Sequence, residues 1–224
     1  MNSGLFATQV NAVERFLIDL DLLGDRVAYP LYKKMIAKDF KHLSYLELWE
    51  KCYSEKLYDF RLFDDSLLQF RSTSFKPLCV NYSYYECPYF PHISFEDYTK
   101  QQLIAEQESD NYDLIRDYEL QIPIKKDAVT PIRYDYATSM YTEGLHPASH
   151  MHLGHNNQIR VGTKHILRPL SFVLFIIRQF YPIKWQEFTR LKKAEEICRN
   201  VSHNLDEVGA NYWGNHDMWE MRLV

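Results

Sequence analysis

The fold is best predicted from residues 131–182, PIRYDYATSMYTEGLHPASHMHLGHNNQIRVGTKHILRPLSFVLFIIRQFYP. It contains strand-like segments, five of the chain's nine histidines and the most apolar run of the protein. Residues 132–136 alternate apolar and polar side chains directly after a proline, which predicts a strand. On that strand Arg133 and Asp135 share one face, because side chains two positions apart point the same way.

The rest of this stretch predicts two further strands and a buried helix. His150–Leu153 and Gln158–Gly162 are expected to pair around a short turn. Pro169 suits the first turn of a helix, and Leu170–Tyr181 is apolar nearly all round. That pattern predicts a helix packed against the sheet, and Pro182 is expected to end it.

Upstream of this stretch, the sequence alternates again. Leu57–Phe63 and Leu67–Ser72 flank the turn residues Asp-Asp-Ser, which predicts a β-hairpin, and Leu78–Tyr85 predicts a third strand. Residues 92–130 contain a helical pattern and an excess of acidic side chains between positions 96 and 119. We expect them to form an acidic helical insertion on the surface.

The beginning of the chain has helical periodicity instead. Residues 5–23 place apolar side chains at helical spacing, and Gly24 is a plausible stop. A second helix is expected over Tyr32–Phe40. A third begins after Ser44, an N-cap residue that has Glu47 three positions on, as in a capping box.

Together these patterns predict one α+β domain over residues 1–224, with an antiparallel sheet of about five or six strands packed by helices. It divides into a helical N-terminal part (1–56), a sheet core (57–182) with the insertion at 92–130, and a C-terminal part (183–224). The C-terminal part is expected to form a helix over Trp185–Arg199 and an aromatic tail that docks on the rest.

Charge is unevenly distributed along the chain. The formal net charge is −4, yet residues 131–200 carry ten Lys and Arg against five Asp and Glu. This segment is therefore +5 and the remainder −9. A basic segment beside a histidine cluster suits an anionic substrate or nucleic acid, although a solvated helix face explains many of the same charges.

Glycine is scarce, and neither GxGxxG nor GxxxxGK[ST] is present, which disfavours the common nucleotide-binding folds. The four cysteines form no CxxC pair, as expected for free thiols in a reducing cytoplasm. The first residues lack a signal-peptide pattern, and the apolar run Leu170–Ile177 is too short to cross a bilayer. We therefore expect a cytoplasmic protein without a membrane partner.

The histidines suggest a metal site. His150 and His152 are two apart on a predicted strand, so both imidazoles point to one face, where Asp135 can reach them from the neighbouring strand. Two imidazoles and a carboxylate bind zinc, manganese or iron and leave positions open for water. A metal-bound water is a nucleophile near neutral pH, so the three residues are also the candidate catalytic residues.

Arg133, Arg160 and His146 are the candidate substrate-binding residues. Two guanidinium groups can hold a phosphate or carboxylate through paired hydrogen bonds. The competing interpretation is structural: histidines in a polar hairpin often satisfy backbone groups, and Asp135 can simply pair with an arginine. A general base without any metal, at His150 or His152, is a third possibility.

Two known metal-binding motifs are matched only in part. Ser149–His155 resembles the HxHxDH signature of metallo-β-lactamase-like hydrolases, but Gly154 stands in the aspartate position. The spacing from Gly144 to His150 and His152 resembles the first cupin motif, whose glutamate is missing here. Neither resemblance fixes the metal or the reaction.

Several short pieces together resemble one further family. They are LFDDSLLQF at 62–70, IRYDY at 132–136, HPASHMHLG at 146–154, RPL at 168–170 and FYP at 180–182. This pattern is similar to an uncharacterised bacterial family, a domain of unknown function, over Leu57–Pro182. The resemblance implies no established activity. Similar stretches in proteins of bacterial conflict systems imply a defence context.

Two functional hypotheses follow. The first is a metal-assisted hydrolase of phosphodiesters or nucleotides in a bacterial defence system, using zinc or manganese. The second is a non-catalytic adaptor or specificity subunit that binds nucleic acid or a protein partner encoded nearby.

Overall fold

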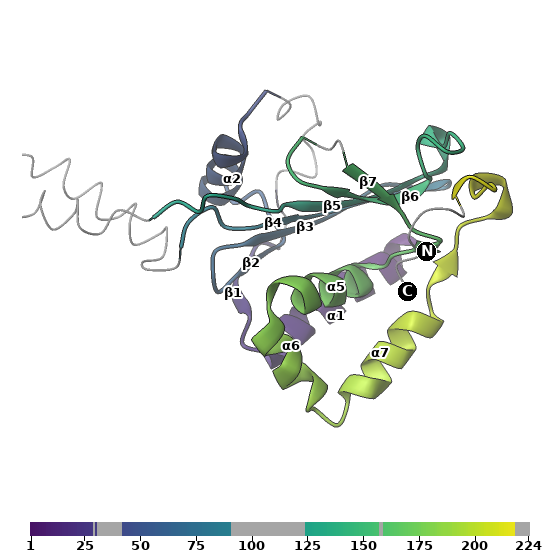
Figure 1. Ribbon diagram of the computed structural model, residues 1–224. Coiled ribbons are helices and arrows are strands. Elements are labelled where there is room, and N and C mark those ends of the chain that lie inside the picture. The colour runs from purple at the N-terminus through teal and green to yellow at the C-terminus, as the bar shows by residue number, and fades with distance from the viewer. Residues whose placement is uncertain (29, 31–41, 91–123, 157–158, 218–224) are drawn as a thin grey trace, which may run out of the picture.

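The protein is described by a computed structural model that covers residues 1–28, 30, 42–90, 124–156 and 159–217 (Figure 1). A seven-stranded antiparallel sheet, with its strands in chain order, forms the centre. The strands are β1 (Leu23–Arg26), β2 (Phe60–Leu62), β3 (Leu67–Phe75), β4 (Leu78–Tyr85), β5 (Ile132–Ala137), β6 (Ser149–Leu153) and β7 (Ile159–Gly162). The expected α+β class is confirmed, with one strand more than the largest number expected.

The extra strand is β1, in a segment expected to end a helix. The first helix, α1 (Ser3–Asp19), stops before it, and Gly24 lies at an irregularity in the pairing of β1 with β2. A Cβ at Gly24 would lie 2.9 Å from the backbone oxygen of Leu62. Gly24 therefore permits a close approach between two strands rather than ending a helix.

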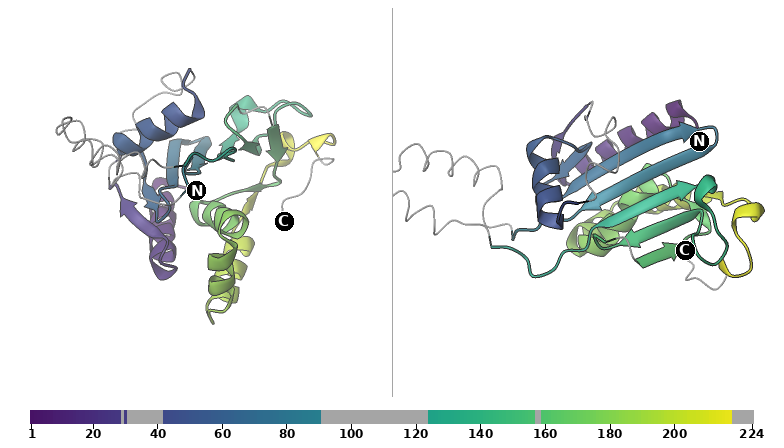
Figure 2. Two further views of the ribbon diagram at one scale, coloured as in Figure 1. Left: turned by 60° about the vertical axis from the view of Figure 1, so that its left-hand side comes forward. Right: turned by 90° about the horizontal axis from the view of Figure 1, so that it is seen from above.

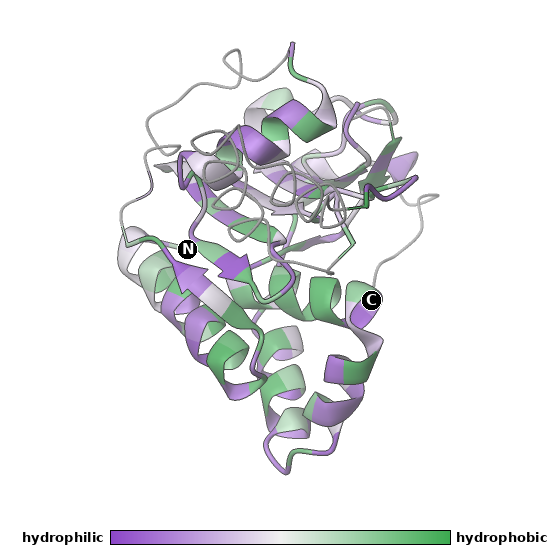
Figure 3. Ribbon diagram, turned by 90° about the vertical axis from the view of Figure 1, so that its left-hand side faces the viewer, coloured by the Kyte–Doolittle hydropathy of each residue, from purple (hydrophilic) through white to green (hydrophobic). Residues whose placement is uncertain are grey.

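One face of the sheet packs on helices. Cross-strand neighbours on this face include Phe70, Tyr82, Tyr134 and Met151, all of them buried. Helices α1 and α5 (Pro169–Phe180) cover this face (Figures 1 and 2). Figure 3 shows hydrophobic residues in the layer where these helices meet the sheet. The apolar helix expected after Pro169 is thus confirmed, with the proline in its first turn.

The opposite face carries α2 (Tyr45–Ser54) and a set of polar residues, several of which are buried. Ser44 and Glu47 form the expected capping box, and Trp49 is fully buried beneath the helix. Beside α2, the pairing register aligns polar residues across the strands in two rows. The rows are Gln69–Ser83–Arg133–His152–Arg160 and Arg71–Asn81–Asp135–His150–Gly162.

The C-terminal part differs from the single helix expected over Trp185–Arg199. Helix α6 (Pro182–Thr189) and helix α7 (Ala194–His203) are separated by a turn. Pro182 follows the end of α5 and is the first residue of α6. Two short strands, β8 (His165–Ile166) and β9 (Asp206–Glu207), pair separately from the main sheet. None of the helices in the described part of the chain has the length and hydrophobicity needed to cross a bilayer.

The tail contacts the connection between β5 and β6 through Asp217. This residue is fully buried, and its carboxylate accepts hydrogen bonds from the Tyr141 hydroxyl and the Gly214 backbone N–H. The helix expected over Tyr32–Phe40, the acidic segment up to residue 123 and the last residues of the tail lie outside the described residues.

Candidate functional site

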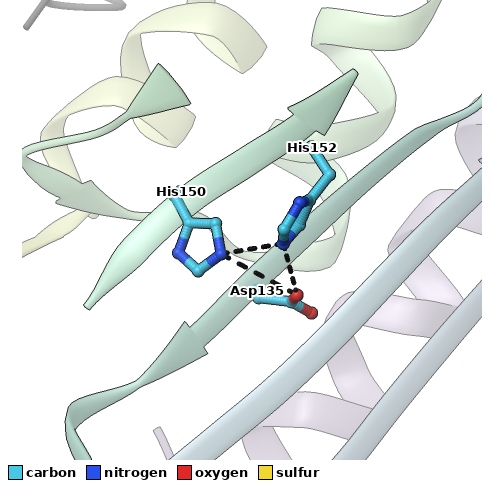
Figure 4. A group of neighbouring side chains, drawn as sticks. All are labelled: Asp135, His150 and His152. Carbon is cyan, nitrogen blue, oxygen red and sulfur yellow. Dashed lines mark hydrogen bonds and ion pairs between the residues drawn. The ribbon is translucent and has the colours of Figure 1, made fainter. Parts of the chain in front are cut away.

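His150, His152 and Asp135 converge on the polar face of the sheet. Strands β5 and β6 are neighbours, and their register places Asp135 opposite His150 and Arg133 opposite His152. Because side chains alternate along a strand, the two histidines and the aspartate point to the same side. Figure 4 shows both imidazoles and the carboxylate directed toward one another.

The three potential ligand atoms are close enough to share one ion. His150 Nε2 lies 2.9 Å from His152 Nε2, His152 Nε2 lies 3.2 Å from Asp135 Oδ2, and His150 Nε2 lies 3.9 Å from that oxygen. Zinc bonds of about 2.0–2.1 Å in tetrahedral geometry separate ligand atoms by about 3.3 Å. The observed triangle therefore needs adjustments of only about half an ångström to fit around a metal.

The surroundings of His150 fix which ring nitrogen is available. Its Nδ1 lies 2.7 Å from the Pro147 carbonyl oxygen, which can only accept a hydrogen bond, so Nδ1 carries the proton. The Nε2 lone pair consequently faces His152 and Asp135. A backbone carbonyl on the far nitrogen is the arrangement that orients many metal-binding imidazoles.

In the absence of metal, His152 Nε2 is placed to donate its proton. Its neighbours there are the His150 lone pair and the Asp135 carboxylate, both of which are acceptors. A bound metal would occupy the lone pair of this nitrogen, and the proton of the neutral ring would then have to be carried by His152 Nδ1.

Asp135 is held by two partners besides the histidine pair, Arg133 and Asn81. Arg133 reaches Oδ2 with Nε at 2.9 Å and Nη2 at 2.8 Å, and the Asn81 amide donates to Oδ1. Burial would raise the pKa of Asp135, but the hydrogen bond to His152, the charge of Arg133 and the Asn81 amide outweigh it and lower the pKa to about 2. The carboxylate is thus ionised and ready to bind a cation at neutral pH.

The two imidazoles are almost inaccessible, whereas the carboxylate is not. His150 and His152 are each 2% exposed, while the Asp135 side chain is 23% exposed. Burial lowers the pKa of His150 to about 4, so this ring is neutral over the physiological range. A neutral imidazole is the form that binds metal.

The low pKa of His150 predicts a loss of stability in acid. Between about pH 6.5 and pH 4 the unfolded chain binds a proton at this ring that the folded protein does not. The free energy of unfolding of the metal-free protein should therefore fall through this window, by on the order of 3 kcal/mol. Urea unfolding in a chelating buffer at several pH values measures the slope.

The matching variants for this measurement are His150→Gln and His203→Gln. The first should flatten the slope, and the second, at an exposed position near the end of α7, should keep it. An unchanged slope in His150→Gln would contradict the assignment. Asp135 affects stability only at lower pH. Its pKa is lowered from 3.8 to about 2 in the folded protein, so its stabilising contribution is lost as the pH falls from about 3.8 to about 2.

The predicted substrate-binding residues lie around the cluster. Arg160 is exposed on β7 directly opposite His152. The His146 ring is 4.8 Å from that of His150, and its pKa is lowered by burial and by the charge of Arg160. The His146 Nδ1 atom is buried without a hydrogen-bond partner among the described residues. Arg133 is directed at Asp135, so its role in substrate binding stays a prediction.

Other histidines are outside the cluster. His155 Nε2 lies 2.9 Å from the Leu43 carbonyl oxygen, His165 lies near Glu207, and His216 is beside Glu143. Among the described residues, His150, His152 and Asp135 form the one group with metal-binding geometry. His203, near the end of α7, and His216 are outside this group.

Two contributors were not identified from sequence, Asn81 and the carbonyl of Pro147. Asn81 alternates with the apolar residues of β4, so its face could have been predicted from periodicity, but its partner strand could not. The carbonyl of Pro147 has no side-chain signature at all. Its position depends on the turn that precedes β6.

A protein-family model matches most of this chain. No curated protein and no solved structure is significantly similar to this chain. The family model described as "Uncharacterized conserved protein (DUF2290)" matches residues 16–209, which include the whole cluster. The membership of an uncharacterised family expected from the short sequence pieces is thus confirmed. The chain belongs to the DUF2290 family of uncharacterized conserved proteins.

Proposed function

We propose that this protein is a metal-dependent hydrolase of phosphodiester or nucleotide substrates, in which His150, His152 and Asp135 bind one zinc or manganese ion. The observation that carries the proposal is the triangle of two imidazole nitrogens and one carboxylate oxygen, with sides of 2.9, 3.2 and 3.9 Å. Three protein ligands leave coordination positions for water and substrate, as in catalytic zinc sites.

The chemistry follows from this ligand set. A metal ion held by His150, His152 and Asp135 would lower the pKa of a bound water and so supply the nucleophile for attack on the phosphorus atom. A new P–O bond forms, the bond to the leaving oxygen breaks, and that oxygen takes up a proton. Arg160, exposed beside His152, neutralises charge on the phosphate, while Arg133 orients the Asp135 carboxylate.

His146 is assigned to the substrate side of the site. Its ring packs edge-on against that of His150, and its Nδ1 atom is not satisfied by the described part of the protein. Burial and Arg160 lower the pKa of His146, so this ring is neutral at pH 7 and able to accept a hydrogen bond or a proton. That property suits contact with an attacking water or a substrate hydroxyl.

Turnover of a small diester tests the proposal. Protein stripped with a chelator should not hydrolyse bis(4-nitrophenyl) phosphate, and added zinc or manganese should restore hydrolysis. His150→Ala should stay inactive after metal addition. His203→Ala, which removes an imidazole at an exposed position, should behave as the unmodified protein. Equal rates with and without metal would refute metal-dependent hydrolysis.

The 2% exposure of both imidazoles favours a second candidate function. Buried histidines can serve as a structural centre, in which case the protein is a non-catalytic adaptor of a bacterial defence system. The expected observation is then a co-purifying protein encoded by a neighbouring gene, retained by His150→Ala and His152→Ala. A metal-restored diesterase activity would exclude this alternative.

A further inference from the structure

Three arginines share the polar face of the sheet with the proposed metal site. The two cross-strand rows contain Arg71, Arg133 and Arg160 against a single acidic residue, Asp135. The three arginines and the one aspartate give these rows a formal net charge of +2. The whole chain is at −4, so positive charge is enriched in these two rows.

The arginines are on both sides of the cluster. Arg71 is on β3, in the same row as Asn81, Asp135 and His150, and Arg160 is on β7, in the same row as His152. Arg71 is half-buried and Arg160 exposed, and neither forms an ion pair with an acidic side chain of the described residues. Arg133 between them is already paired with Asp135.

The distance between the outer arginines exceeds what a single phosphate can bridge. From β3 to β7 there are four strand spacings of about 4.8 Å, or about 19 Å between backbones. A nucleic-acid strand carries a phosphate about every 3.4 Å of helical rise. A ligand that contacts both arginines while a phosphate reaches the cluster must therefore have several phosphates in a chain.

The buried cluster also restricts the shape of this ligand. Because His150 and His152 are each 2% exposed, a phosphate has to enter from the partly exposed Asp135 side. A duplex holds its phosphates on a stiff cylinder, whereas a single strand can bend one phosphate inward. On this face, helix α2 lies over one end of β3 and β4 (Figure 2, right).

We propose that the polar face is a binding track for single-stranded nucleic acid, with Arg71 and Arg160 contacting backbone phosphates on opposite sides of the His150–His152–Asp135 cluster. This inference rests on the proposed phosphodiesterase function and names its substrate class. Contacts of this kind are independent of sequence and weaken with salt, because each neutralised phosphate releases counterions.

Fluorescence anisotropy with labelled single strands of DNA and RNA tests the track. The full chain is used in a chelating buffer, between about 50 and 200 mM salt, with strands long enough to span both arginines. Binding of either single strand, tighter than binding of the equivalent duplex, is the expected result. Arg71→Glu and Arg160→Glu should each weaken binding by about tenfold and reduce the salt slope by about one.

Arg190→Glu is the control with the same change of charge. Arg190 is exposed and directly follows α6, a helix on the helical side of the sheet (Figure 1). This variant should bind as the unmodified protein does. Three results would overturn the inference: duplex bound as tightly as single strand, equal weakening by Arg190→Glu, or displacement of the strand by polyglutamate at equal charge concentration.

The inference and the catalytic proposal fail separately in the unmodified protein. Strand binding without any metal-restored turnover of bis(4-nitrophenyl) phosphate supports the track and refutes the hydrolase. Turnover of the small diester without strand binding refutes the track and supports the hydrolase.

Discussion

Replacing Asp135 with asparagine is expected to lower the affinity for zinc or manganese by at least about a hundredfold. Loss of a residue that only orients a metal ligand typically costs 10- to 100-fold in affinity, so loss of a ligand should cost no less. The amide has nearly the same shape as the carboxylate but lacks its charge. Competition with a fluorescent chelator measures the affinity, and metal-restored diester turnover should disappear with it.

The fold should tolerate Asp135→Asn. Arg133 would lose its ion-pair partner, but its side chain is 34% exposed, so water can solvate the guanidinium. Unfolding in urea at pH 7 checks that the variant remains folded. His203→Ala is the matched control and should keep full metal affinity. Unchanged metal affinity in folded Asp135→Asn would show that the three side chains form a structural network.

The same-face geometry of the cluster could be predicted from sequence because it depends on local periodicity. Alternation places His150 and His152 on one side of β6, and it places Arg133 and Asp135 on one side of β5. The register between the two strands is a different matter. It is set by the connection over residues 138–148, whose short 3-10 helix and turn have no strong sequence signature. A slip by one residue would have pointed the two pairs to opposite faces.

The failures in the fold have similarly local causes. β1 is only four residues long, Leu-Gly-Asp-Arg, and begins at the end of the run with helical spacing, so its sequence contains no strand signal of its own. The turn between α6 and α7 follows Arg190, within a run of lysine and arginine that is compatible with a helix. In both places tertiary packing determines the secondary structure, because intrinsic helix propensity contributes too little free energy to override it.

The largest stability effect is expected in the apolar layer between α5 and the sheet. Phe172 is fully buried on α5. Its ring centroid lies 6.4 Å from that of Phe70 and 5.8 Å from that of Tyr82, so one side chain joins the helix to two adjacent strands. Large neighbours held in a sheet cannot move in to fill the space of a lost ring. Truncation here should therefore leave a cavity.

Phe172→Ala is expected to lower the free energy of unfolding by about 3–5 kcal/mol, the combined cost of lost burial and the cavity. Urea unfolding monitored by circular dichroism measures this change. Phe175→Ala is the matched control, because Phe175 lies on the same helix but is only partly buried, and its truncation should cost clearly less. Equal losses for the two variants would contradict the placement of α5. A strongly destabilised Phe172→Ala that still binds metal when folded would show that the apolar layer supports the sheet without shaping the cluster on its other face.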